Sequence, residues 1–323
     1  MVSTDKDSDS RKDLIRRQDT TDISVFYSMP PLPALPQEST DMPITTAGPS
    51  ATPQHDSFPG LAQFGADFTA LQLDLDPGRP DRVHVRMNRP EVRNAIDETM
   101  ASEFHALCAW LERHPRTLII SGTELTHPET GEKRGVFASG ADIRELRERR
   151  RDDALRGVNS RVFTRIHQLP MPVIAALDGY ALGGGAELSY AADFRLATPH
   201  VKFGQPETGL GIIAAAGALW RLKDLVGEAI ALEMLLAGRI LDAREAKELN
   251  LVSALHPPEE LIDAAHALAD RIAAQDPLAV RISKKVFHLP REAHPHVDEL
   301  AQAIVFESEA KFDRMQAFLS RKK

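Results

Sequence analysis

The chain has 323 residues, a formal net charge of −8 and an isoelectric point near 5.9, and 42% of its residues are hydrophobic. This composition can build a sizeable core, and the acidic balance argues against a general nucleic-acid or membrane binder. A single cysteine, Cys108, excludes an intrachain disulfide and fits a reducing, cytoplasmic compartment. No apolar run reaches the ~18 residues that a membrane span needs.

The composition changes near residue 60. Residues 1–60 are rich in Pro, Ser, Thr and Asp, show little periodicity and contain no apolar segment of the kind found in secretory signals. Such a stretch cannot bury enough apolar surface to offset the entropy of ordering it. The sequence therefore predicts a disordered extension over 1–60, an α/β core over 61–255 and a helical region over 256–323.

The core is expected to open with a β-hairpin, because "TALQLDLD" and "DRVHVRM" alternate apolar and polar residues around "PGRPD". Apolar residues at helical spacing predict a helix after Asp97, with Cys108 in its buried face. Buried strands are expected at 116–122, 135–140 and 172–180. The long link "SGTELTHPETGEKRGVF" is expected to be a surface loop insertion.

Further along, "AELSYAA" predicts the start of a helix, and "FRLATPHVKFGQPE" predicts two short strands and a turn. After Gly217 the pattern is mostly helical. Asp276 is expected to cap a helix with Pro277 at its first position, and Asn250 is expected to end another in the left-handed conformation.

Glycine-rich turns are the most informative feature. The triplet Gly183–Gly185 separates a strand from a helix, and bare backbone there leaves free N–H groups at the helix start. "FASGADI" repeats the arrangement, with small residues at 138–141 before Asp142. Two such turns can direct two N–H groups at one oxygen, as an oxyanion hole requires. For an isolated triplet, a tight crossing of strand and helix is the alternative explanation.

Two glutamates accompany these turns. Glu187 lies in the first turn of the helix after the triplet, and Glu207 lies in the Pro- and Gly-rich segment "FGQPETGLG". Either one alone could be only a favourable charge at a helix start or a solvated turn residue. Together, beside an oxyanion hole, they indicate acid–base chemistry next to a carbonyl group.

Five segments occur in the order and near the spacing of one family: "NRPEVRNAID", "FASGADI", "GYALGGGAEL", "FGQPETGLG" and "EMLLAGRILDAREAKELNLV". From about residue 68 onward the chain resembles the enoyl-CoA hydratase/isomerase (crotonase) superfamily, and most of all its enoyl-CoA hydratases. The resemblance implies an α/β spiral of ββα units, with a C-terminal helical region that supports trimers or hexamers. It also implies an acyl-CoA thioester substrate, an enolate-like intermediate, and no cofactor or metal beyond the CoA of the substrate.

The resemblance also assigns roles. It gives the oxyanion-hole N–H groups to Ala141 and Gly184, the water to Glu187, and proton supply at the α-carbon to Glu207. The remaining expected substrate contacts follow the thioester and nucleotide path: Arg93, Ala95, Ala138, Gly140, Asp142, Ile143, Arg144 and Gly183. The arginines that follow could meet CoA phosphates or form a salt-bridged, solvated helix face: Arg147, Arg149, Arg150 and Arg151.

One segment departs from the hydratase pattern. After "QPETGLG", Ala214, Ala215 and Ala218 replace a proline and two glycines, and Trp220 replaces a glutamine. Three functions therefore stay open. The first is hydration of a 2-enoyl-CoA in fatty acid metabolism, which the two glutamates favour. The second is a double-bond isomerase or C–C lyase on the same scaffold, and the third is a non-catalytic or RNA-binding protein, against which the acidic balance argues.

Overall fold

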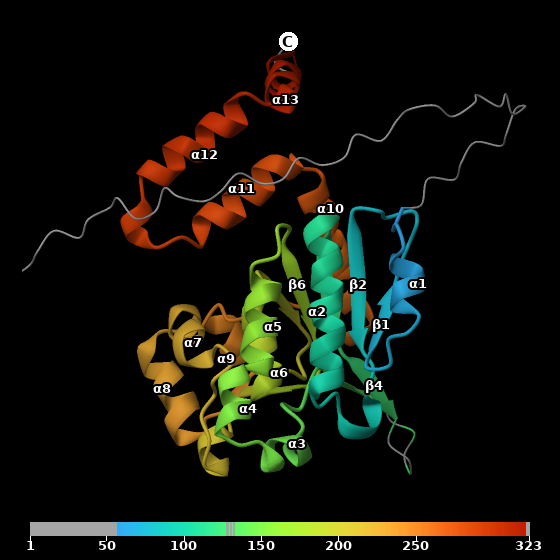
Figure 1. Cartoon of the computed structure of the whole chain (residues 1–323), viewed down its shortest axis with the longest axis vertical. Helices are drawn as coiled ribbons and strands as arrows, with labels where there is room; N and C mark the ends of the chain where they lie inside the picture. The colour runs from blue at the N-terminus through green and yellow to red at the C-terminus, as the bar shows by residue number, and fades with distance from the viewer. Residues whose placement is uncertain (1–56, 127–128, 130, 132, 321–323) are drawn as a thin grey trace, which may run out of the picture. The chain divides into compact units, whose positions relative to one another are not determined.

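A computed structural model describes residues 57–126, 129, 131 and 133–320 (Figure 1). Most of the extension that the sequence predicts to be disordered, up to residue 56, lies outside these residues. The described part packs from its start, because Phe58 is buried in the core and the Pro59 carbonyl accepts a hydrogen bond from Trp110 Nε1 at 2.9 Å.

A six-stranded sheet forms the centre of the fold. The first pair of strands is antiparallel, as expected for the predicted hairpin, and every later pair is parallel. Parallel neighbours need crossover connections, which the intervening helices supply. The strands, in spatial order, are β1 (Leu71–Asp74), β2 (Arg82–Met87), β3 (Thr117–Ser121), β6 (Val173–Leu177), β8 (Phe194–Ala197) and β11 (Ala254–Leu255).

Helices cover both faces of this sheet. On one face, α2 (Glu98–Arg113), α5 (Val158–His167) and α6 (Gly184–Ala191) enclose the main core, and α2 and α5 lie side by side (Figure 1). On the other face, α10 (Leu261–Ala273) packs on the side chains of β3, β6 and β8. Because both faces are covered, β3 and β6 are buried along their whole length, which explains their continuous apolar sequences.

Smaller sheets flank the centre. A three-stranded sheet joins β10 (Leu241–Asp242), β9 (Lys202–Gly204) and β7 (Tyr180–Leu182). The segment predicted as a surface loop insertion instead forms, at its two ends, the antiparallel strands β4 (Thr123–Thr126) and β5 (Lys133–Val136). Their side chains are mostly exposed, so the segment carries little of the apolar alternation that would have indicated strands.

The strand predicted at 135–140 ends at Val136, and of the predicted residues beyond it only Ala138 is paired, in an isolated parallel bridge with Ala181. Other local predictions are confirmed. Asp97 caps α2 by accepting from Met100 N at 2.8 Å, and Asp276 caps its helix by accepting from Ala279 N at 2.8 Å. Asn250 adopts a φ of 60°.

The remaining helices are α1 (Leu61–Gly65), α3 (Ile143–Glu148), α4 (Arg151–Arg156), α7 (Ala218–Val226), α8 (Glu228–Ala237), α9 (Ala243–Glu248), α11 (Pro277–Phe287), α12 (His296–Phe306) and α13 (Glu309–Ser320). The last three contain no fully buried residue. Among the described helices, none combines the length and the apolar character needed to cross a bilayer.

Candidate active site

A cavity of about 570 Å³ lies where the two glycine-rich turns meet the starts of three helices. Gly140 and Ala141 line it from the turn before α3, Gly183 and Gly184 from the start of α6, and residues 157–160 from the start of α5. Glu187 and Glu207 both face this cavity. Residues from four separate parts of the sequence therefore share one concave site.

Backbone pairing brings the two turns side by side. Ala138 forms a parallel bridge with Ala181, in which Ala138 N donates to the Tyr180 carbonyl and Leu182 N donates to the Ala138 carbonyl. Three residues farther along each segment come Ala141 and Gly184. The bridge thus places the ends of both segments in register at the cavity.

The N–H groups of Ala141 and Gly184 donate to no acceptor among the described residues. Ile96 bridges the residues on either side of Ala141, accepting from Asp142 N and donating to the Gly140 carbonyl. An extended chain alternates its N–H directions, so the Ala141 N–H points away from Ile96. Gly184 is the first residue of α6, where N–H groups have no partner within the helix.

Glu187 is buried at 3% exposure and held in place by backbone. Its Oε1 accepts from Ala216 N at 2.7 Å and from Ala218 N at 3.0 Å. Burial, with a smaller contribution from the charge of Glu207, raises the pKa of Glu187 to about 7 against the opposing pull of these backbone N–H groups. A carboxyl group whose pKa lies near neutral pH can act as a base or an acid there.

Glu207 lies at the start of a short 3-10 helix (Glu207–Leu210) and is 8% exposed. Burial also raises the pKa of its carboxyl group. With the amide nitrogen of Gln205 assigned toward it, Gln205 donates to Glu207 Oε2 at 3.0 Å. Burial thus makes both carboxyl groups harder to ionise than in water, and the two can divide the acid and base roles of one reaction between them.

Comparison with known proteins places this arrangement in a family. The family model for enoyl-CoA hydratase/isomerase matches residues 83–323. The chain belongs to the enoyl-CoA hydratase/isomerase family. The predicted superfamily membership and crotonase-like α/β fold are thereby confirmed.

Named relatives support the match. The chain is 33% identical over 250 residues to the short-chain-enoyl-CoA hydratase of Clostridium acetobutylicum, covering 74% of this chain and 91% of that protein. It is 34% identical to the crotonyl-CoA hydratase of Syntrophomonas wolfei, covering 73% and 91%. The crystal structure of an enoyl-CoA hydratase from Bacillus anthracis superposes with a TM-score of 0.70 at 29% identity, covering 78% and 97%.

The structure of this family member gathers some of the predicted site residues and separates others. The cavity is lined by seven of them: Gly140, Ala141, Ile143, Gly183, Gly184, Glu187 and Glu207. Arg93 and Arg144 are exposed outside its lining, whereas Ala95 and Ala138 are buried behind it. Asp142 caps α3 by accepting from Arg144 N at 3.0 Å, which is a structural role.

The arginines after Arg144 divide between the two predicted readings. Arg147 and Arg151 are exposed and form ion pairs with neighbouring acids, as a solvated helix face would. Arg149 pairs with Glu145 at 3.1 Å and also lines the cavity, as does Arg150. Two members of the cluster are therefore closer to the cavity than Arg144 is.

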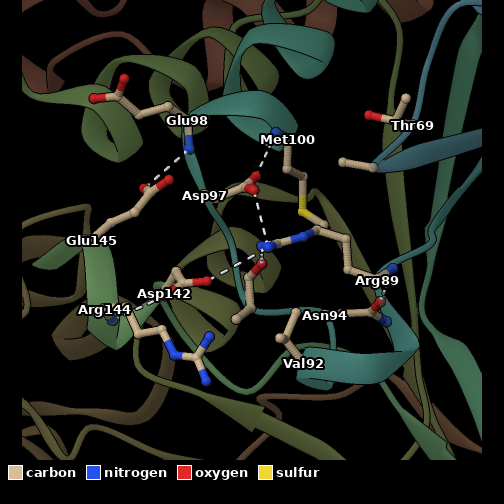
Figure 2. Close-up of polar contacts among 12 residues, drawn as sticks. Thr69, Arg89, Val92, Asn94, Asp97, Glu98, Met100, Asp142, Arg144 and Glu145 are labelled. Carbon is tan, nitrogen blue, oxygen red and sulfur yellow. Dashed lines mark hydrogen bonds and ion pairs between the residues drawn. The ribbon is translucent and has the colours of Figure 1, made fainter.

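Arg89 was not singled out from the sequence, although it lies in the motif "NRPEVRNAID". Figure 2 shows its guanidinium group between Asp97 and Asp142, at 3.1 Å and 3.6 Å. Arg89 Nη1 also donates to the Ala95 carbonyl at 2.5 Å. Arg89 thus ties the cap of α2 to the cap of α3 and so holds the turn that carries Ala141.

The segment that departs from the hydratase pattern retains a structural role at the site. Ala215 and Ala216 line the cavity, and the backbone of Ala216 and Ala218 holds Glu187. A backbone N–H is supplied by any residue except proline, so the alanines can keep this support. Trp220 is half exposed and lies under the guanidinium group of Arg221, away from the cavity lining.

Proposed function

We propose that this chain adds water to the double bond of a 2-enoyl-CoA thioester and forms a 3-hydroxyacyl-CoA. The observation that carries the proposal is that one cavity holds two buried glutamates and two backbone N–H groups that find no acceptor in the described part of the chain. The activity named in the relatives from Clostridium acetobutylicum and Syntrophomonas wolfei supports it.

In the proposed reaction, the thioester oxygen binds between Ala141 N–H and Gly184 N–H. As a hydroxyl group adds at the β-carbon, electrons move onto the thioester oxygen, where these two donors stabilise the charge. One preset donor of this type is typically worth about 2.7–4 kcal/mol. Because the backbone on both sides of each N–H is already hydrogen-bonded, the donors need little rearrangement when the charge develops.

The two glutamates complete the proton balance. Glu187, with Oε1 held by two N–H groups, takes a proton from the attacking water, and Glu207 supplies a proton to the α-carbon. One proton is taken and one is given, so the net change is the addition of one water. The pKa of Glu187 near 7 suits a base that works at neutral pH.

The acyl group occupies the part of the cavity beyond the glutamates. The cavity lining offers it apolar side chains, among them Leu146, Val158, Ile212 and Ile213. An unsaturated hydrocarbon chain would gain about 25 cal/mol for each Å² of its apolar surface that these residues cover. The CoA portion extends from the thioester toward the cavity opening.

Self-association is the second part of the proposal. The helices α11, α12 and α13 expose large apolar side chains, among them Phe287, Leu300, Phe312 and Phe318 at 59–80% exposure. Apolar surface of this extent commonly marks a protein–protein contact. We propose that these helices contact other copies of the chain in a trimer or hexamer.

The test compares two substrates. We would follow loss of the conjugated enoyl absorbance with a panel of 2-enoyl-CoA thioesters, and double-bond migration with a 3-enoyl-CoA, for the wild type, Glu187→Gln and Glu207→Gln. Each variant should lower hydration by at least about a hundredfold, the scale of one general acid–base contribution. Faster isomerisation of 3-enoyl-CoA than hydration of 2-enoyl-CoA by the wild type would replace this proposal with an isomerase.

A further inference from the structure

Asn159 brings a side-chain amide to the place where the two free backbone N–H groups meet. It is the second residue of α5 and lines the cavity together with Gly184 and Glu187. A Cβ atom added to Gly184 would lie 3.6 Å from Asn159 Nδ2 and 3.4 Å from Ala141 N. The space that this Cβ atom would fill is therefore bordered by Asn159 Nδ2 and by Ala141 N.

The local structure does not account for this side chain. Asn159 Oδ1 is buried and has no hydrogen-bond partner among the described residues. A buried acceptor left unpaired typically costs about 1–3 kcal/mol. Asn159 is not the cap of α5, since Gly157 holds that position, and asparagine is a weak helix former. The unpaired Oδ1 atom is covered by protein, so we look for the reason for this asparagine at its Nδ2 atom, which borders the space beside Gly184.

We propose that Asn159 is a third donor to the thioester oxygen, acting with the N–H groups of Ala141 and Gly184. The inference rests on the function proposed above and adds a residue to it. The charge on an enolate oxygen can accept three hydrogen bonds, and a donor in a cavity shielded from water interacts with it more strongly than in bulk solvent.

The effect should appear in turnover more than in binding. A contact that strengthens as charge develops lowers kcat when it is removed, whereas a contact made equally in the ground state raises KM. A preset backbone donor is worth about 10²–10³ in kcat. A side chain that can rotate should contribute less, so we expect a loss of about tenfold to a hundredfold.

Asn159→Leu keeps the size of the side chain and removes both hydrogen-bonding groups. We expect kcat for 2-enoyl-CoA hydration to fall at least about tenfold with KM changed less than about threefold. The melting temperature should stay the same or rise, since an unpaired buried oxygen is lost. Thr164→Val, which removes a hydroxyl group from the same helix outside this cavity, is the matched control and should leave kcat unchanged.

Equilibrium binding separates this inference from the reaction itself. A 3-ketoacyl-CoA can bind as its enolate, with charge on the thioester oxygen, while a saturated acyl-CoA of the same length cannot. Asn159→Leu should weaken binding of the 3-ketoacyl-CoA at least about fivefold more than binding of the saturated thioester. Equal weakening of both ligands, or a kcat like that of the wild type, would overturn the role of Asn159 even if hydration is observed. Binding of neither thioester to the wild type would refute the proposed function itself, and with it this inference.

Discussion

The Oε1 atom of Glu207 lies 2.6 Å from the position that a Cβ atom on Gly183 would occupy. Real Cβ atoms do not approach other atoms so closely, and Gly183 also has a φ of 50°, which strains residues with side chains. The carboxyl group of Glu207 therefore fills the space that a side chain at position 183 would need. The first glycine of the triplet is bare because a catalytic candidate lies against it.

Gly183→Ala should move Glu207 out of position. We expect hydration to fall at least about a hundredfold, the scale of one general acid–base contribution. Strain at the positive φ should destabilise the fold by about 1–3 kcal/mol. Gly209→Ala is the matched control, because a Cβ atom at that position, in the 3-10 helix that Glu207 begins, meets nothing within 4 Å. Steady-state kinetics and urea unfolding would measure both effects, and full activity in Gly183→Ala would contradict the contact.

Substitution of Gly184, the second glycine of the triplet, should give a different result. A Cβ atom on Gly184 meets no atom nearer than 3.4 Å, so Gly184→Ala should fold with a melting temperature near that of the wild type. Its methyl group would nevertheless occupy the space beside Ala141 N, and we expect turnover to fall at least about a hundredfold. In Gly185→Ala the Cβ atom would lie 2.4 Å from the Ala138 carbonyl oxygen, so that variant should instead lose stability. Normal turnover by a well-folded Gly184→Ala variant would show that the space beside Gly184 is not part of the substrate site.

The buried Glu187 makes stability depend on pH. Its pKa is about 7 in the folded chain against an ordinary value of 4.5, so the folded state binds more protons than the unfolded state between these values. Ionisation of Glu187 should therefore cost the folded state more as pH rises from 4.5 to 7, by about 3 kcal/mol in full above pH 7. The side chains of His84 and His167, whose pKa values burial lowers to about 4, act in the opposite direction, so the contribution of Glu187 is measured against a variant. Glu187→Gln keeps the acceptor for Ala216 N and Ala218 N, and should be more stable than the wild type at pH 8 by up to this amount.

Denaturant unfolding at pH 4.5 and at pH 8 would measure the difference for both proteins. Near pH 4.5 the carboxyl group is protonated in the folded state, and the two proteins should have similar stability. An advantage of Glu187→Gln that is the same at both pH values would show that the pKa of Glu187 is not raised.

Arg89 should matter for both stability and turnover. Arg89→Met removes the cation between Asp97 and Asp142 and leaves two partly buried carboxylates without it, which we expect to cost about 3 kcal/mol or more. Arg86→Met is the control. Arg86 pairs with Asp74, and the two side chains are 42% and 37% exposed, so loss of this ion pair should lower the stability by about 1 kcal/mol or less. Thermal unfolding and kcat would be compared, and similar losses in the two variants would refute a special role for Arg89.

The exposed apolar side chains of α11, α12 and α13 predict self-association, and a single charge introduced among them should weaken it. Leu300 on α12 is 70% exposed, so Leu300→Asp should leave the fold of one copy unchanged and disfavour association. Sedimentation velocity should show a trimer or hexamer for the wild type and smaller species for the variant. Leu300→Lys introduces the opposite charge at the same position and should weaken association in the same way. A monomeric wild type would contradict the proposed self-association.

Much of this site could be predicted from the sequence because its requirements are local. A backbone that must approach a ligand needs glycine or alanine, and the triplet at 183–185 and the turn at 138–141 carry that requirement in short, ordered motifs. The helix caps at Asp97 and Asp276 could be predicted for the same reason, since a cap depends on a few adjacent residues. Glu187 and Glu207 stand out for the same reason, since each lies in or beside a glycine-rich turn; the resemblance assigns their separate roles, and both line the cavity.

Tertiary structure decided what depends on residues far apart in the chain. Arg89 joins two helix caps that lie 45 residues apart in the sequence, and the motif that contains it does not reveal these partners. Asn159 becomes a candidate site residue only because the fold brings its Nδ2 atom close to Gly184 on another helix. In the sequence it is an ordinary polar residue. The support for Glu187 comes from the N–H groups of Ala216 and Ala218, which side-chain identity does not encode. Contacts of this kind are set by where packing brings the segments together, because backbone donors are the same for nearly every residue and only the fold determines which ones face the site.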